Sequence, residues 1–226
     1  MEHREAVVVK MNRSYTVLIS LIVALGGFLL GFDSAVISGA VKGITVYFDM
    51  SDAMLGFAVG CVIFGAMARN LLAGPVADRF GRKKVLIVVA ALFTISASWS
   101  ALATGYTEFI IARIIGGVGI GGAILIAPIY IAEIAPPKLR GSLVSFNQLN
   151  IVIGISVAYF SNYFLVDLGE ESWRWMLGVE AIPAAIYFLS LFTVPRSPRW
   201  LIQRLNQVKL ARKILQRIGG EAYAEY

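Results

Sequence analysis

The chain has 226 residues, of which 58% are hydrophobic and 15% charged, with a mean hydropathy of +0.75. Because an ordinary globular domain carries about 25% charged residues, this composition excludes a water-soluble fold. The net charge of +6 lies in short segments between apolar stretches, so it does not form the continuous basic surface of a nucleic-acid-binding protein.

Six apolar stretches predict membrane-spanning helices, because each is near the ~20 residues that cross ~30 Å of hydrocarbon. A span isolated in lipid must be helical, since only a helix satisfies its own backbone hydrogen bonds there. We therefore expect an all-α membrane protein whose core is a six-helix bundle. The predicted spans are Tyr15–Ser38, Ala53–Val76, Val85–Ala103, Thr107–Ile131, Leu143–Leu165 and Trp175–Val194.

Three regions are expected along the chain: a cytoplasmic tail (1–14), the transmembrane bundle (15–194) and the start of a helical linker (195–226). The linker is basic and amphipathic, with apolar residues at helical spacing. It predicts a short pair of cytoplasmic helices at the membrane face, and an ordinary lipid-surface anchor is the alternative. The apolar residues that recur at this spacing are Leu201, Leu205, Val208, Ile214, Leu215 and Ile218.

Basic residues in the loops indicate the orientation of the spans. Nearly all of them lie on the side that holds both termini, and only Lys42 and Arg174 lie on the other side. Cytoplasmic loops carry the excess of Lys and Arg. We therefore expect a multi-pass protein of the cell membrane, plasma or bacterial inner, with both termini in the cytoplasm. The acidic loop Asp167–Trp173 is then external, and Trp173 and Trp175 are expected to be interfacial anchors.

The segment GPVADRFGRKK (Gly74–Lys84) forms a short basic loop between the second and third spans. Gly81 permits a tight turn, and Asp78 can lie at a helix N-terminus. A plain positively charged cytoplasmic loop is the alternative interpretation. As a specific string, Gly-x-x-x-Asp-Arg-x-Gly-Arg-Lys resembles the loop signature of the major facilitator superfamily.

Further strings narrow this resemblance to the sugar porter family, in the right order and over nearly the whole chain, from about Ser14 to Arg217. The resemblance implies twelve spans in two six-helix bundles, each a 3+3 repeat, of which this chain is the N-terminal half. The strings are GFDSAVISG (Gly31–Gly39), PIYIAEIAPPKLRG (Pro128–Gly141), SFNQ (Ser145–Gln148) and VPRSPRWL (Val194–Leu201).

The function implied by the resemblance is secondary active sugar transport by monosaccharide:proton symport, without enzymatic chemistry or a cofactor. A facilitated sugar uniporter and a non-transporting truncated half are the alternatives. The expected partners are a monosaccharide, the proton, the lipid bilayer and the missing C-terminal half, and no nucleic acid. One histidine in the tail and one cysteine in a span leave no metal-ligand cluster.

Three charged residues inside spans are the main candidates for function, because a charge at the centre of a membrane helix costs at least ~2.5–3.5 kcal/mol. Asp33, Arg113 and Glu180 are all expected within ~10 Å of the outer interface, at nearly one depth. Two acids around one Arg leave a net negative charge, so one carboxyl is disposed to take up a proton. A static ion pair is the alternative, but the resemblance links Asp33 and Arg113 to proton coupling.

On the cytoplasmic side, the resemblance implies a gate that interlocks the two halves of the transporter. One family position departs from the pattern, because Arg196 stands where the family motif has an acid. The charge pairing of the gate must therefore be rearranged or weaker. The gate residues carried over by the resemblance are Asp78, Arg79, Gly81, Arg82, Glu133 and Arg140.

Gln148 matches a position that hydrogen-bonds sugar hydroxyls in the family. An interhelical hydrogen bond is the alternative role for a Gln inside a span. The second Gln that the family often carries is Ile155 here, which leaves the identity of the sugar open.

Two other features receive no functional role. The string GVGIGG (Gly117–Gly122) fits a dinucleotide-binding pattern, but it lies inside a predicted span with no preceding strand. Its glycines, like Gly27 and Gly31, are typical of close helix packing in lipid. Arg69 is a fourth charge within a span, and no role is assigned to it.

Overall fold

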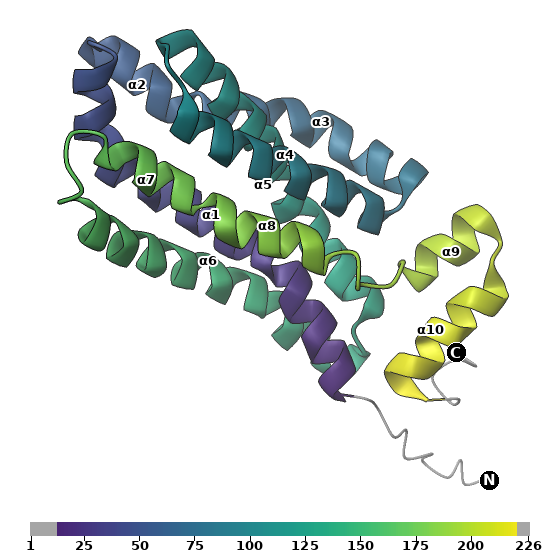
Figure 1. The fold of residues 1–226 in the computed structure, drawn as a ribbon. Helices are drawn as coiled ribbons and strands as arrows, with labels where there is room; N and C mark the ends of the chain where they lie inside the picture. Colours follow the sequence, from purple (N-terminus) through teal and green to yellow (C-terminus); the bar gives the residue numbers. More distant parts are fainter. Residues whose placement is uncertain (1–12, 221–226) are drawn as a thin grey trace, which may run out of the picture.

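The computed structural model describes residues 13–220, apart from the side chains of residues 13, 68–72, 138 and 219. Every regular element in this range is a helix, which confirms the all-α prediction (Figure 1). The elements are α1 (Arg13–Tyr47), α2 (Asp52–Gly60), α3 (Val62–Phe80), α4 (Arg82–Leu102), α5 (Tyr106–Ile134), α6 (Pro137–Leu165), α7 (Ser172–Val179), α8 (Ala181–Ser190), α9 (Pro198–Leu205) and α10 (Val208–Gly219).

Four of these helices are long and apolar enough to cross a membrane: α1, α4, α5 and α6. The second and sixth spans differ from the prediction, because each is divided by one residue into two shorter helices. Cys61 separates α2 from α3, and Glu180 separates α7 from α8. Both junction residues keep right-handed helical backbone angles, so each pair of helices continues as one span (Figure 1).

The break at Glu180 has a local cause in Pro183. Proline has no backbone N–H, and its ring clashes with the carbonyl four residues earlier, so the hydrogen bond to Val179 is lost. The sequence showed this proline, but the prediction placed one uninterrupted span across it. The residue at the break, Glu180, is one of the three charged residues that were predicted to be functional.

The first span is longer than predicted. Its helix continues past the predicted end at Ser38 to Tyr47, through Gly39 and Gly43. Both glycines serve close packing. A Cβ atom on Gly39 would lie 2.4 Å from Asn162 of α6, and one on Gly43 would lie 2.8 Å from Trp173 of α7.

Two of the three most extensive helix contacts follow a repeated plan. The first span (α1) packs on the fifth (α6), and the fourth (α5) packs on the second (α3). In a 3+3 repeat the first span corresponds to the fourth and the second to the fifth. The two pairs are therefore equivalent to each other. The contacts therefore agree with the 3+3 repeat that the family resemblance implied.

Glycines permit the same close approach in both of these pairs. Between α1 and α6, a Cβ on Gly31 would lie 1.9 Å from the carbonyl oxygen of Ile151, and one on Gly154 would lie 2.1 Å from that of Phe28. Each clash is with a backbone carbonyl three residues before the facing glycine. No side chain larger than hydrogen fits at either position.

Between α3 and α5, the equivalent glycines make equivalent contacts. A Cβ on Gly65 would lie 2.1 Å from the carbonyl oxygen of Ile114, and one on Gly117 would lie 2.1 Å from that of Val62. Gly117 is the first glycine of the dinucleotide-like string, and it lies in the middle of a helix. The prediction that this string serves helix packing is confirmed.

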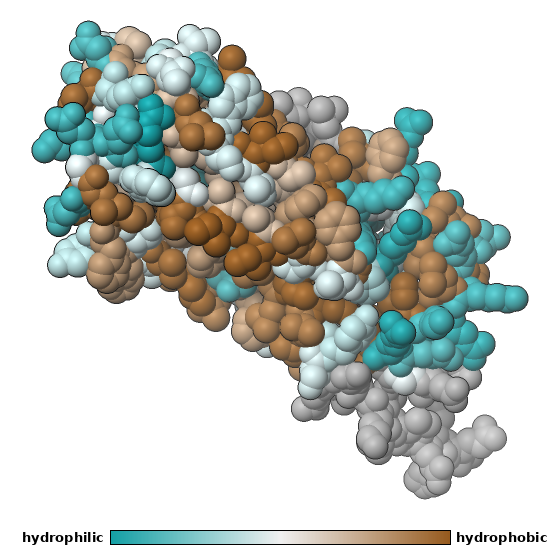
Figure 2. All heavy atoms as spheres, in the orientation of Figure 1, coloured by the Kyte–Doolittle hydropathy of each residue, from teal (hydrophilic) through white to brown (hydrophobic). Residues whose placement is uncertain are grey.

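The bundle is apolar along its middle and polar at its two ends, as Figure 2 shows. At one end, Trp173 packs among Tyr47, Phe48 and Phe109, with ring centroids 5.3–6.5 Å apart. Trp173 is fully buried, so its prediction as an interfacial anchor is wrong, whereas Trp175 is 62% exposed. At the other end lie the basic helices α9 and α10 (Figure 1).

Candidate functional site

Asp33 of α1 and Arg113 of α5 form an ion pair inside the bundle. Nη1 of Arg113 donates to Oδ1 of Asp33, and Nη2 lies 3.4 Å from Oδ2, so the two planar groups face each other. Both residues are buried, with exposed fractions of 5% and 4%. The expectation that Arg113 lies within salt-bridge reach of an acid is confirmed.

Glu180 joins this pair from the break between α7 and α8, and it is only 2% exposed. Its charge and that of Asp33 both act on Arg113. Among the described residues, Oε1 of Glu180 has no hydrogen-bond partner, and neither does Nε of Arg113. The three residues predicted from the sequence therefore converge, but only Asp33 is directly bonded to the guanidinium.

The charge balance of this cluster is incomplete. One guanidinium compensates one carboxylate, so a second ionised carboxylate would be buried without a counter-charge or a full set of hydrogen bonds. An uncompensated buried charge is costly, and a carboxyl group avoids the cost by binding a proton. The arrangement can therefore hold one exchangeable proton in addition to the ion pair.

Asp33 lies farther from the end of its helix than from the predicted end of its span. It lies fourteen residues before the end of α1, which is about 21 Å at 1.5 Å per residue. Arg113 lies only seven residues into α5. The groups nevertheless meet, because α1 continues beyond the start of α5.

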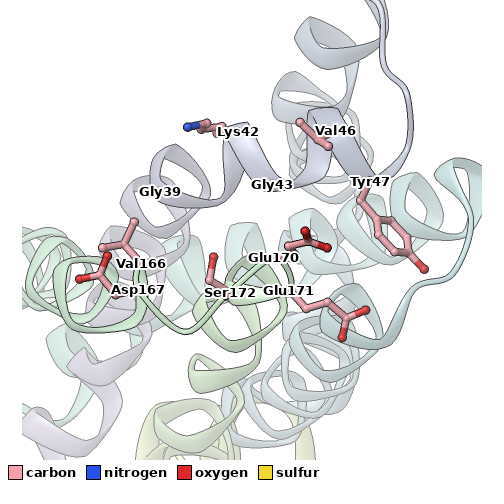
Figure 3. Close-up of a pocket in the computed structure, with 11 residues that line it drawn as sticks. Gly39, Lys42, Gly43, Val46, Tyr47, Val166, Asp167, Glu170, Glu171 and Ser172 are labelled. Carbon is pink, nitrogen blue, oxygen red and sulfur yellow. The ribbon is translucent and has the colours of Figure 1, made fainter.

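A cavity of about 750 Å³ lies at the same end of the bundle as the start of α7. Its walls are the last turns of α1 and the connection from α6 to α7 (Figure 3). Asp167, Glu170 and Glu171 face it from the connection, and Lys42 lies on α1 (Figure 3). The acids of the predicted external loop thus line one wall of this cavity.

At the opposite end, Arg82 holds two acids from different helices. Its Nη1 lies 2.9 Å from Oδ1 of Asp78, and its Nη2 lies 3.1 Å from Oε1 of Glu133. Ser197 adds a hydrogen bond of 2.6 Å from its hydroxyl to Oε2 of Glu133. This network links the α3–α4 junction to the end of α5 and the start of α9.

Gly81 forms the tight turn between α3 and α4, with a φ of 90° that favours glycine. The ring of Trp200 lies against it, 3.0 Å from where a Cβ would be. The indole Nε1 of Trp200 donates to the carbonyl of Asp78 over 2.9 Å. Sequence reasoning missed both Trp200 and Ser197, because nothing in their spacing connects α9 with the distant α3–α4 turn.

The other predicted gate residues lie outside this network. Arg79 lies over the ring of Phe80, 5.5 Å from its centroid. Arg140 and Arg196 are exposed and form no ion pair with another described residue. Arg69 has no described side chain, so its position is outside the part of the chain that the structure describes.

Gln148 is exposed on α6, with no hydrogen bond to the rest of the described chain. Its neighbour Asn147 is the buried amide, pressed against Gly27 of α1. A second buried amide, Asn162, donates to the carbonyl of Val36 over 3.2 Å. Sequence reasoning missed both asparagines, and the helical period that places them on the α1-facing side of α6 could have found them.

Comparison with known families matches residues 19–225 to the family described as "Sugar (and other) transporter". The arabinose-proton symporter of Bacillus subtilis is 42% identical over 220 residues, covering 95% of this chain and 47% of the relative. The D-xylose-proton symporter of Escherichia coli is 40% identical over 245 residues, covering 94% and 50%. The chain thus spans about half the length of the curated relatives it matches.

Solved structures agree with this match. The major facilitator superfamily proton:xylose symporter XylE, bound to 6-bromo-6-deoxy-D-glucose, superimposes with a TM-score of 0.89 at 39% identity. The superposition covers 95% of this chain and 52% of that one. An inward-open XylE from E. coli gives a TM-score of 0.84 over 93% of this chain and 54% of the other. The described helices therefore have the fold of one half of such a transporter.

Proposed function

Because the chain belongs to the sugar transporter family of the major facilitator superfamily, we propose that it forms the first half of a monosaccharide:proton symporter. The single observation that carries the proton part of this proposal is the buried cluster of Asp33, Arg113 and Glu180. A facilitated uniporter would not need a second buried acid beside an ion pair that is already neutral.

In the proposed mechanism, Asp33 is the proton carrier. In the arrangement described above, its carboxylate is ionised and paired with Arg113. A proton from the outer solution binds an oxygen of Asp33 and removes the charge that holds the guanidinium. Arg113 then compensates Glu180 in its ionised form, whose Oε1 has no partner among the described residues, so the cluster holds one ion pair and one proton. One proton thus breaks the ion pair between α1 and α5. This change links proton binding to movement of the helices.

The sugar is proposed to bind beside Gln148, on the side of α6 that the other helices leave uncovered. The amide of Gln148 is exposed and offers both a donor and an acceptor to sugar hydroxyl groups. Transporters of this architecture hold their substrate near the midplane, between two six-helix bundles. The second bundle would supply the other wall of the site.

We propose that the end of the bundle with α9 and α10 faces the cytoplasm. The basic residues of the described loops and short helices are concentrated there. The acidic cavity beside α7 is then the external entrance. Rocking between the two bundles would open the sugar site alternately to the two sides.

We expect the 226-residue chain alone not to transport sugar. Without a second bundle, Gln148 and Asn150 would face lipid or a disordered cavity, at about 1–3 kcal/mol for each unsatisfied group. Purified chain in liposomes with an imposed pH gradient should show no saturable uptake of radiolabelled pentose or hexose. Saturable, proton-driven uptake would instead identify the chain as a dimeric half-transporter, because two copies could cover these faces.

A further inference from the structure

Arg174 is a basic residue of α7 at the end of the bundle opposite to α9 and α10, and the proposed mechanism gives it no role. Its side chain is only 17% exposed. Nη1 donates to the carbonyl oxygen of Ala101 over 2.8 Å and to that of Ala103 over 2.9 Å. These carbonyls belong to the last turn and the cap of α4, where a helix leaves such groups without helical partners. Arg174 thus closes the end of α4 with a charge of the sign that the helix dipole favours there.

The same guanidinium is held by two aromatic rings. Its Cζ lies 4.7 Å from the ring centroid of Tyr47 at the end of α1 and 4.4 Å from that of Trp173. A guanidinium within about 6 Å of a ring centroid is attracted by the face of the ring. Glu171 lies 3.6 Å from Nε but is 64% exposed, so this ion pair contributes little. Arg174 therefore joins the ends of α1, α4 and α7 through contacts that are largely shielded from water.

The short helix that Arg174 holds leads directly to the buried charge cluster. α7 has eight residues, and Glu180 follows its last residue, six positions after Arg174. At 1.5 Å per residue, the two positions are about 9 Å apart along the helix. Because Pro183 interrupts the hydrogen bonds of the span at this point, α8 constrains α7 less than an unbroken helix would. The position of Glu180 beside Arg113 therefore depends on what holds α7.

Contacts with the last turn of α4 fix α7 along its own axis. Trp173 and Met176 are buried in the apolar core at this end, but apolar attraction has no preferred direction. The hydrogen bonds of Arg174 are directional, so they resist a shift of α7 along α4. At the other end of α7, a Cβ on Gly178 would lie 3.3 Å from the Cβ of Ala101. Both ends of α7 are thus placed against the same turn of α4.

We propose that Arg174 is a positioning residue for proton coupling, because it holds α7 on the end of α4 and thereby keeps Glu180 within reach of Arg113. This inference rests on the proposed function. In that mechanism a proton on Asp33 releases Arg113, which compensates Glu180 only if its carboxylate is already close. Without the guanidinium of Arg174, α7 shifts more freely. Sugar then moves without the proton that should accompany it.

The first measurement is the number of protons that enter with each xylose in a fusion of this chain to the C-terminal half of the E. coli D-xylose-proton symporter. Arg174→Met removes the guanidinium and keeps most of the apolar stem. It should lower the ratio of protons to sugar severalfold, while exchange of labelled xylose continues. Arg174→Lys should restore part of the ratio, because an ammonium keeps the charge but not the planar group that reaches both rings and both carbonyls.

Tyr106→Phe is the matched control, because it removes a contact at the same end of the bundle that has no part in holding α7. The hydroxyl of Tyr106 donates to the carbonyl of Met54 over 3.1 Å and joins α5 to α2. Both variants should lower the Tm, but only Arg174→Met should change the ratio of protons to sugar. Equal ratios in the two variants would overturn the proposal, since Arg174 would then only stabilise the fold.

A second measurement does not need transport. Infrared difference spectra of the 226-residue chain between acidic and alkaline solution record the C=O band of a buried protonated carboxyl, which Asp33→Asn and Glu180→Gln assign to the cluster. Arg174→Met should shift or broaden this band, and Tyr106→Phe should leave it in place. An unchanged band in Arg174→Met would overturn the proposal. If the wild-type fusion carries no protons with xylose, the proposed function fails, whereas the band still decides whether Arg174 positions the cluster.

Discussion

Asp33→Asn will abolish uphill sugar accumulation and leave sugar exchange intact in a twelve-span protein that carries this chain as its first half. The change removes the titratable proton but keeps the size of the side chain and its capacity to accept a hydrogen bond from Arg113. Fusion of the chain to the C-terminal half of the E. coli D-xylose-proton symporter provides such a protein. Accumulation against a gradient and counterflow of labelled xylose are then measured in the same vesicles.

Asp167→Asn is the matched control for this experiment. Asp167 is an exposed acid that lines the cavity beside α7 and has no ion pair within the described chain, so its loss should leave accumulation near the wild-type level. Undiminished accumulation in the Asp33→Asn protein would rule Asp33 out as the proton carrier. Loss of exchange as well as accumulation would indicate a structural ion pair, since disrupting the fold stops both.

Gly31→Ala will disrupt the bundle. The added Cβ would lie 1.9 Å from the carbonyl oxygen of Ile151, and a backbone atom in the middle of a helix cannot move aside as a flexible side chain can. Overpacking of this kind typically costs about 1–3 kcal/mol, and the contact here is with backbone on both helices. We expect the unfolding transition in detergent to move to clearly lower denaturant, or the protein not to be recovered folded.

Gly56→Ala is the control, because Gly56 is also a helical glycine but has nothing within 4 Å of its Cβ position. That variant should be as stable as the wild type or slightly more stable, since alanine is the better helix former. Equal stability of the Gly31 and Gly56 variants would contradict the close packing of α1 on α6. The equivalent change at Gly117 should repeat the effect of Gly31→Ala, because it makes the same contact on α3.

Much of the fold could be predicted because lipid imposes simple rules on sequence. Apolar stretches of spanning length identified the six spans, and the cost of a buried charge identified Asp33, Arg113 and Glu180 before their contacts were known. These rules predicted the ends of the helices less accurately than their existence. The first span was predicted to end at Ser38, yet its helix continues to Tyr47, and Gly39 and Gly43 are packing positions against α6 and α7.

What could not be predicted depends on contacts between segments far apart in the chain. Trp173 has the position of an interfacial anchor in the sequence, and only the packing of α1 and α5 around it makes it a core residue. The role of Trp200 against Gly81 likewise needs α9 to fold back on the α3–α4 turn. Arg196 was recognised as a change of sign, but its position beside Lys83 and Lys84 is a result of the fold alone.

The central proposal is that a transporter with this chain as its first half couples sugar movement to proton movement, and the direct test is the proton flux that accompanies sugar entry. Vesicles containing the fusion with the C-terminal half of the E. coli symporter are placed in lightly buffered medium, and xylose is added without an imposed gradient while a pH electrode records the external solution. The account predicts a sugar-dependent alkalinisation of the medium that is absent in the Asp33→Asn protein. Saturable xylose entry with no change in external pH would contradict it and identify a facilitated uniporter.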